Sequence, residues 1–221
     1  MSYFDEASII FENEDFLVVV KAQNMPVQPT KASRENLLNL LEEFYEFKRG
    51  VENPYIGLVH RLDQPTGGVM VFAKNKQSAG LLSKSFQAHQ TTKKYRALLH
   101  GKLEGSRGKL VHFHMANVKT NHVEVSDEPK AGSKQSILDY VVLGHKTVKG
   151  ADVTLVEVTL QTGHQHQIRA QFSKIGHGLI GDRKYGVLLD NLPLMLWSVS
   201  LTFELKGEKF SFDIEPPQLL C

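Results

Sequence analysis

Several features that would restrict the class of protein are missing from this chain. Its 221 residues include a single cysteine, Cys221, so a disulfide framework and zinc sites built on paired cysteines are excluded. No apolar run reaches the roughly 18 residues that a membrane span needs. The opening residues also lack the basic and then apolar order of a secretion signal. These absences favour a globular protein of the reducing cytoplasm.

Linkers, repeats and phosphate-binding loops are missing as well. No stretch rich in Pro, Gly or Ser divides the chain and no segment repeats, so we expect a single domain over residues 1–221. The pair Gly67-Gly68 is not followed by the lysine of a Walker loop. With 41% hydrophobic and 23% charged residues, the composition is that of a folded protein.

The charge is distributed unevenly along the chain. Residues 1–59 hold 5 basic and 10 acidic side chains, whereas residues 60–109 hold 10 basic and 2 acidic ones, a net charge of +8. Residues 110–221 are nearly balanced, and the whole chain carries +2. A basic block of this kind is typical of a surface that binds a polyanion, although a solvated lysine-rich face has the same composition.

Short runs of β-branched and aromatic residues predict a protein built mainly from strands. The alternating strand–helix order of a Rossmann domain is absent, so the pattern predicts an α+β fold with a mixed, mostly antiparallel sheet. The expected strands are 16–20, 69–73, 95–99, 110–113, 137–143, 153–160 and 194–205.

Three segments have helical spacing. Apolar residues at i, i+3, i+4 and i+7 predict a helix over 34–48. Asn75 is an expected N-cap for a second helix that turns Ala79, Leu82 and Phe86 inward.

The third helix is expected to begin near Gln165. Thr162 and Gln165 have the spacing of a capping box, and Ile168, Phe172 and Ile175 form the apolar stripe.

Three stretches carry residue types suited to chemistry. In LVHRLDQPTGGVMVFA (58–73), the lone carboxylate of Asp63 follows Arg61 and precedes a Pro-Gly turn, as in a nucleophile or base held ionised by a cation. The segment KKYRALLHG (93–101) places Tyr95 among cations, which suits base stacking with phosphate contacts. In 162–186, His166 and Arg169 share a helix face opposite the apolar stripe. Each stretch also has a plain structural interpretation as a capped turn, an edge strand or a surface ion pair.

Two histidine pairs raise the possibility of a metal site. His112 and His114 share one face of a strand, whereas His164 and His166 straddle a helix start. Neither pair has a third ligand at a recognised spacing. A metal-dependent hydrolase is therefore the weaker interpretation, and we expect no metal.

Taken together and in this order, the three stretches resemble the RluA family of pseudouridine synthases. The opening IIFENEDFLVVVKAQNMPVQPT and the closing LMLWSVSLTFELKGEKFSFDIEPP extend the resemblance over nearly all of the chain. It implies a pseudouridine synthase fold with a central RNA-binding cleft, as one catalytic domain over 1–221 without a separate N-terminal RNA-binding domain. It also implies a reaction that needs neither a metal nor an organic cofactor.

The resemblance also implies roles for individual residues. Asp63 corresponds to the catalytic aspartate, Tyr95 to the tyrosine that stacks on the base and assists proton removal at carbon 5, and Arg169 to the charge partner of the aspartate. The residues leave open whether Asp63 attacks the sugar or the base. The implied RNA-contact residues are Arg61, His60, Thr66, Lys93, Lys94, His166 and Gln167.

The sequence departs from the family pattern in four places. It reads KAQNMPV where KPAGLPV is usual, Gly67 where Ser is usual, His164 where Arg is usual, and Trp197-Ser198 where His-Ala is usual.

The expected function is isomerisation of specific uridines in ribosomal or transfer RNA by a monomer without membrane or obligate protein partners. A non-catalytic RNA-binding or RNA-chaperone protein that retains the fold is the alternative.

Overall fold

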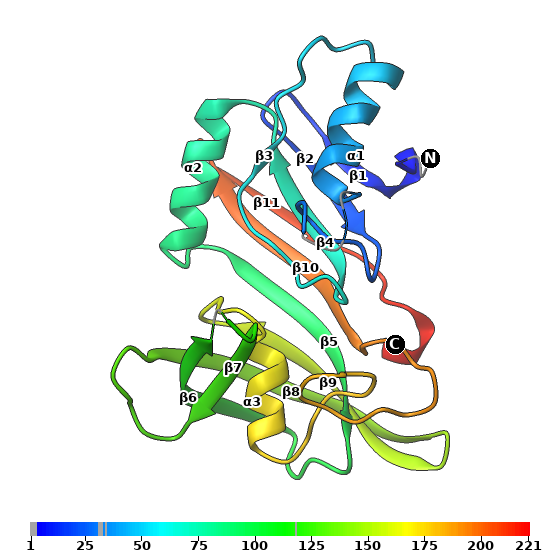
Figure 1. Ribbon diagram of the computed structural model, residues 1–221, viewed down its shortest axis with the longest axis vertical. Coiled ribbons are helices and arrows are strands. Elements are labelled where there is room, and N and C mark those ends of the chain that lie inside the picture. The colour runs from blue at the N-terminus through cyan, green and yellow to red at the C-terminus, as the bar shows by residue number, and fades with distance from the viewer. Residues whose placement is uncertain (1–3, 31–32, 34, 118) are drawn as a thin grey trace. The chain divides into compact units, whose positions relative to one another are not determined.

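The computed structural model describes residues 4–30, 33, 35–117 and 119–221. The chain divides into two compact units, which are described one at a time (Figure 1). Unit 1 comprises residues 1–91 and 200–214, and unit 2 comprises residues 92–199 and 215–221. None of the helices in the described ranges combines the length and the apolar character needed to cross a membrane.

Unit 1 is a sheet with helices packed on it. Strand β2 pairs antiparallel with β1 on one side and with β4 on the other, and β3 also pairs with β4. Strand β11 pairs antiparallel with the end of β10. The strands are β1 (Ile9–Glu12), β2 (Phe16–Lys21), β3 (Gly57–Leu58), β4 (Gly67–Ala73), β11 (Glu208–Asp213) and the part of β10 (Leu196–Leu205) from residue 200 onward.

The core of unit 1 lies between the sheet and helix α2 (Lys76–Gln87). Leu82 and Phe86 pack against buried strand residues, as the helical spacing predicts, and Ala79 adjoins them. The Asn75 side chain accepts a hydrogen bond from the backbone N–H of Ser78 at 2.8 Å, which confirms the predicted N-cap. The sequence pattern therefore correctly predicts both where α2 begins and which face it buries.

The first predicted helix also forms, with a change of pitch. Helix α1 (Leu37–Glu43) continues directly into a π-helical turn, Phe44–Lys48. Leu37, Leu40 and Leu41 are buried as predicted, and Phe44 is buried at the junction. Phe47, which the same pattern assigns to the core, is 76% exposed because the wider π turn shifts its side chain off the buried stripe.

Unit 2 is dominated by long antiparallel strands. Strand β9 pairs with both β5 and β8, and β6 pairs with both β8 and β7. The elements are β5 (Thr92–His100), β6 (Arg107–Asn117), β7 (His122–Ser126), β8 (Lys134–Val148), β9 (Ala151–Leu160) and helix α3 (Gln167–Lys174). The α+β class and the mostly antiparallel pairing predicted from the sequence are confirmed.

The start of α3 differs from the prediction. The helix begins at Gln167, and its N-cap is His166, whose φ of +54° is left-handed and which makes no side-chain capping bond. The predicted capping box does not form; instead, Gln167 Oε1 accepts from Thr162 Oγ1 at 2.9 Å and from the His164 N–H at 3.1 Å. Ile168 and Phe172 are buried as predicted.

His114 on β6 is expected to make stability depend on pH. It is 5% exposed, and burial, together with the nearby His164, His166 and Lys134, lowers its pKa to about 4. The unfolded chain takes up this proton near pH 6.5, so the stabilisation is present above that pH and is lost as the pH falls from 6.5 to 4. Urea unfolding across this range should show a loss of up to about 3 kcal/mol attributable to this histidine.

The variant His114→Gln removes the titrating group and should flatten this pH dependence. His100→Gln, at an exposed position on β5, is the matched control and should retain the wild-type slope. A His114→Gln protein whose stability falls with acid as steeply as that of the wild type would contradict the assignment.

Candidate active site

The predicted site residues fall in both units. Asp63 lies in the turn between β3 and β4 of unit 1, residues 60–66, called here the Asp63 turn. Tyr95 on β5 and Arg169 on α3 belong to unit 2. The pairing of Asp63 with Arg169 stays a prediction.

The Asp63 turn is closed by a hydrogen bond within its own backbone. The Thr66 N–H donates to the carbonyl oxygen of Asp63 at 2.9 Å. The side chain of Asp63 is half-buried, Arg61 beside it is exposed, and Thr66 is 2% exposed. The catalytic candidate therefore sits at a partly open position on a fixed backbone, as a reacting carboxylate requires.

A buried lysine, Lys21 at the end of β2, supports this turn. Its side chain is fully buried, and its Nζ donates to the carbonyl oxygens of Ala22, Met25 and Gln64 at 2.9, 2.8 and 3.0 Å. Burial lowers the pKa of Lys21 to about 7, and the nearby charge of Asp63 opposes that shift. The three carbonyl oxygens match the three N–H groups of an ammonium ion, so they too favour the charged form.

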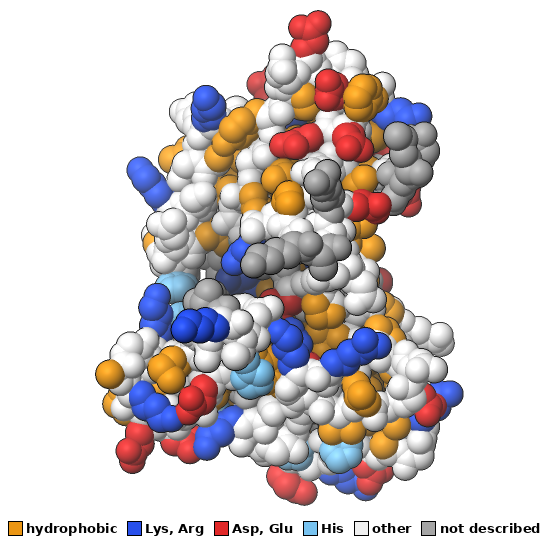
Figure 2. Space-filling view, viewed as in Figure 1, with side chains coloured by type: hydrophobic (Ala, Val, Ile, Leu, Met, Phe, Trp, Pro, Cys, Tyr) orange, Lys and Arg blue, Asp and Glu red, His pale blue; other side chains and the backbone are white. Residues whose placement is uncertain are grey.

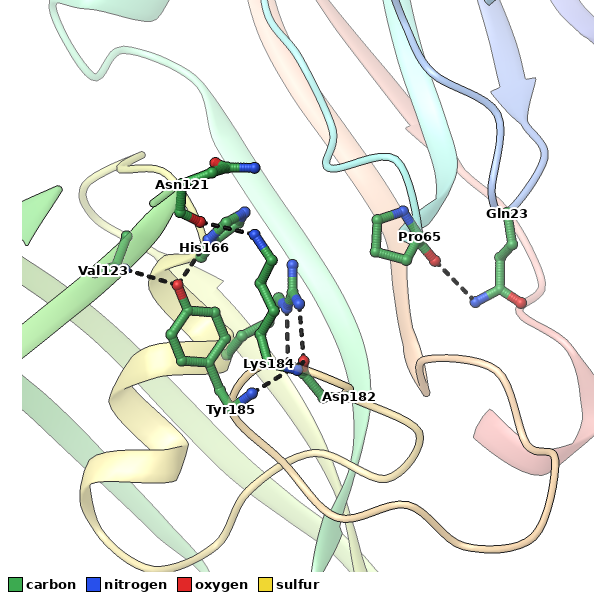
Figure 3. Close-up of polar contacts among 9 residues, drawn as sticks. Gln23, Pro65, Asn121, Val123, His166, Asp182, Lys184 and Tyr185 are labelled. Carbon is green, nitrogen blue, oxygen red and sulfur yellow. Dashed lines mark hydrogen bonds and ion pairs between the residues drawn. The ribbon is translucent and has the colours of Figure 1, made fainter. Parts of the chain in front are cut away.

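A second set of contacts ties the same turn to residues 22–25. Gln23 Nε2 donates to the Pro65 carbonyl at 3.3 Å (Figure 3), and Gln64 Nε2 donates to the Asn24 carbonyl at 3.2 Å. With Lys21, these bonds hold the backbone on both sides of Pro65. Sequence reasoning treated this segment only as an opening strand pair and missed its role as the support of the Asp63 turn.

His60 is bound into the fold of unit 1. Its Nε2 accepts the backbone N–H of Val71 at 3.1 Å, and its ring stacks on Phe86 with the centroids 4.5 Å apart. Because Nε2 accepts this hydrogen bond, the ring proton of His60 is on Nδ1. These contacts give His60 a structural role, and its contact with RNA stays a prediction.

In unit 2, Arg169 is buried beside a carboxylate that the sequence analysis did not single out. Its Nε and Nη2 each donate to one carboxylate oxygen of Asp182, both at 2.8 Å. Arg169 is 4% exposed and Asp182 is 2% exposed. Burial alone would raise the pKa of Asp182, but the hydrogen bonds and charge of Arg169 and the N–H groups of Lys184 and Tyr185 hold it below its ordinary value.

Tyr185 joins this pair to the start of α3 and to β7. The Arg169 guanidinium lies over its ring, 5.3 Å from the centroid. Its hydroxyl accepts the Val123 N–H and bonds His166 Nδ1, both at 2.8 Å (Figure 3). We call the residues His166, Arg169, Asp182 and Tyr185 the Arg169 cluster.

The remaining predicted residues of unit 2 differ in their surroundings. Tyr95 is 7% exposed, and Gln167, at 3% exposed, bonds Thr162 and the Ile137 carbonyl in the interior. Lys94 forms an ion pair with Glu157 at 3.0 Å.

Lys93 is half-buried, and burial lowers its pKa. Its ammonium group lies against Gly163, where any side chain would crowd it. Lys93 and Tyr95 share one face of β5 because they are two residues apart on a strand.

The histidine pairs are bonded within the fold. Gln171 Nε2 lies 3.0 Å from His112 Nδ1, and His164 Nε2 lies 2.9 Å from the Gln135 carbonyl. Across the described residues, no three His, Cys, Asp or Glu side chains form a group that could hold a metal ion.

Charged side chains are unevenly distributed over the surface. On the face drawn in Figure 2, acidic side chains gather over the part of unit 1 that carries α1. Basic and histidine side chains lie over the β7 and α3 region of unit 2 on the same face. A basic region of this kind suits contact with a polyanion, but β7 and α3 lie outside the basic block 60–109 of the sequence.

Several known proteins are similar to this chain in sequence. The family model described as RNA pseudouridylate synthase matches residues 15–174. A protein of Aquifex aeolicus named "Uncharacterized RNA pseudouridine synthase" is 34% identical over 96% of this chain and 70% of its own length. The "Ribosomal large subunit pseudouridine synthase D" of Zymomonas mobilis is 32% identical over 95% of this chain and 69% of its length.

A solved structure supports the same relationship. "Human RNA Pseudouridylate Synthase Domain Containing 1" superposes with a TM-score of 0.81 at 28% identity, covering 95% of this chain and 83% of that one.

The variant Lys21→Met is expected to destabilise the protein. It leaves the carbonyl oxygens of Ala22, Met25 and Gln64 buried without their donor, at a cost of about 3 kcal/mol or more. Equilibrium unfolding in urea measures this loss. Lys76→Met, at an exposed position on α2, is the control and should change stability by less than about 0.5 kcal/mol. Equal stability of the two variants would show that Lys21 does not brace the turn.

Proposed function

The chain belongs to the RNA pseudouridylate synthase family and, within it, to the RluA type, and we propose that Asp63 is its catalytic carboxylate. The protein is accordingly an RNA pseudouridine synthase, an isomerase that acts on uridines in RNA. The observation that carries the proposal for Asp63 is its position in HRLD, inside the matched region, in a turn fixed by Lys21 and the Thr66 N–H.

The reaction needs one nucleophile and one proton acceptor. The bond from ribose C1′ to uracil N1 breaks, the base rotates, and a bond from C1′ to C5 forms; the proton on C5 is lost and N1 gains one. No net oxidation occurs. Asp63 supplies the nucleophile, and the uracil ring leaves and returns within the same site, so a single carboxylate suffices. A glycoside hydrolase, which must also activate water, commonly uses two.

Tyr95 and Arg169 complete the proposed machinery. Tyr95 stacks on the base and assists removal of the C5 proton, a task that suits a tyrosine held on a rigid strand. Arg169 acts on the charge of Asp63 and thereby orients the carboxylate. Both side chains are held by regular elements, β5 and α3.

The target uridine must leave its stack before it can react, which costs a few kcal/mol. We propose that phosphate contacts offset this cost. In this proposal the cations that supply them are Lys93 and Lys94 of β5 and the exposed Arg61. The other contact residues in this proposal are His60, Thr66, His166 and Gln167.

We further propose that the substrate is ribosomal RNA of the large subunit. Support comes from the names of relatives, since the Zymomonas mobilis protein carries "Ribosomal large subunit" in its name. Transfer RNA is the other substrate class that the sequence suggests, and the experiments below separate the two.

The variant Asp63→Asn is expected to abolish product formation. The amide keeps the shape of the side chain but is neither charged nor nucleophilic, so single-turnover release of tritium from RNA carrying 5-tritiated uridine should fall by at least about 10⁴-fold. Asp213→Asn, at an exposed position on β11, is the control and should release tritium at the wild-type rate. An active Asp63→Asn protein would refute the role of Asp63.

The natural substrate is identified by mapping pseudouridine in all cellular RNA of a strain that lacks this protein. We expect one or more sites in large-subunit ribosomal RNA to disappear and to return with the wild-type gene but not with Asp63→Asn. Sites lost only from transfer RNA would reassign the substrate. A growth defect rescued equally by Asp63→Asn would favour a non-catalytic RNA-binding or chaperone role.

A further inference from the structure

The buried carboxylate of Asp182 controls how Arg169 is presented. It binds Nε and Nη2, which lie on one edge of the guanidinium, through both of its oxygens at 2.8 Å. A two-point contact of this kind fixes the plane of the guanidinium as well as its position. The N–H groups on Nη1 are thereby directed away from Asp182.

Asp182 is itself held at a fixed orientation. The N–H groups of Lys184 and Tyr185 donate to its Oδ1 at 2.9 and 3.2 Å, and the Gly186 N–H donates to its carbonyl oxygen at 3.1 Å. Figure 3 shows Asp182, Lys184 and Tyr185 together in this loop. The carboxylate therefore cannot turn without breaking several bonds.

The backbone before Asp182 is equally constrained. Gly181 has a φ of +75°, and a Cβ there would overlap the carbonyl oxygen of Pro193. Ile180 on one side and Val187 on the other form a β-bridge that closes the loop. Such a loop is suited to placing one side chain accurately.

The Tyr185 ring restricts the position of the Arg169 guanidinium from a second direction. The ring lies 5.3 Å from the guanidinium carbon, while its hydroxyl is held by the Val123 N–H and by His166 Nδ1. Arg169 is thus fixed in its plane by Asp182 and covered on a face by Tyr185.

We propose that Asp182 is a positioning residue of the reaction, which acts by fixing the orientation of the Arg169 guanidinium. The inference rests on the proposed function, in which Arg169 acts on the charge of Asp63. Asp182 touches neither RNA nor the reacting atoms in this role. It is distinct from a purely structural ion pair because its effect passes through Arg169 to the rate of the chemical step.

The deciding variant is Asp182→Glu, because it keeps the charge that a buried arginine needs but displaces the carboxylate by one methylene group. We expect it to remain folded and to bind RNA as the wild type does, while its single-turnover rate of tritium release falls by about 10- to 100-fold. The substrate is an in vitro transcript of large-subunit ribosomal RNA with 5-tritiated uridine. Affinity is measured on the same transcript by filter binding.

A double-mutant cycle separates positioning from stability. In an Arg169→Met background, Asp182→Asn should cause no further loss of rate, because the residue on which Asp182 acts is already absent. Asp190→Asn, an exposed acid further along the same segment, is the matched control and should react at the wild-type rate. Thermal unfolding of each variant shows how much folded protein is present.

The outcomes distinguish this proposal from the proposed function. A wild-type protein that releases no tritium, or an Asp63→Asn protein that does, would remove the premise. Activity that is lost in Arg169→Met but kept in full in Asp182→Glu would overturn the positioning role alone. A rate that falls only in step with the folded fraction, or losses that multiply in the double variant, would also overturn it.

Discussion

A buried arginine needs a buried carboxylate, and this requirement shapes the interior of unit 2. The guanidinium cannot shed its proton at any pH that the protein meets, so the burial of Arg169 is possible only with a fixed anion beside it. Asp182 is that anion, and the loop around it is built to hold it. The left-handed turn at His166 and the bonds of Tyr185 then follow, because both bring the start of α3 against this loop.

Unit 1 buries a cation as well, but satisfies it in another way. The ammonium group of Lys21 is compact, and three main-chain carbonyl oxygens receive its three N–H groups. The three hydrogen bonds of the Lys21 ammonium group therefore go to main-chain carbonyl oxygens. The charge of Asp63 still acts on Lys21 through space, since it opposes the fall in pKa that burial causes. This arrangement gives the carboxylate that we propose as the nucleophile a rigid backbone support.

The sequence predicts much of the fold because the local patterns are strong. The apolar run of β2, the Asn75 cap and the stripe of Leu82 and Phe86 all depend on neighbouring residues, and the structure confirms them. Strand β7 was not predicted, since HVEVS has only two apolar residues. The start of α3 was placed two residues early because Gln165 and Gln167 offer the same amide, and only the tertiary fold selects Gln167.

Local sequence patterns do not predict the contacts that hold the candidate site residues. Asp182 stands next to Arg183 and close to Lys184, so a local interpretation would pair it with either of them. Its actual partner is 13 residues earlier on a helix, and the choice depends on how the loop folds back. The support of the Asp63 turn is also non-local, since Lys21 reaches Gln64 across 43 residues. Long-range bonds of this kind leave no periodic signal in the chain.

Three departures from the family pattern lie beside Lys21, in the segment that supports the Asp63 turn. Asn24 stands where glycine is usual and has a φ of +64°, a conformation that asparagine tolerates better than most other residues. Gln23 stands where alanine is usual and adds a hydrogen bond to the Pro65 carbonyl. Ala22 stands where proline is usual, and its carbonyl still accepts from Lys21. Two of the three departures therefore take part in the hydrogen bonds that hold the Asp63 turn.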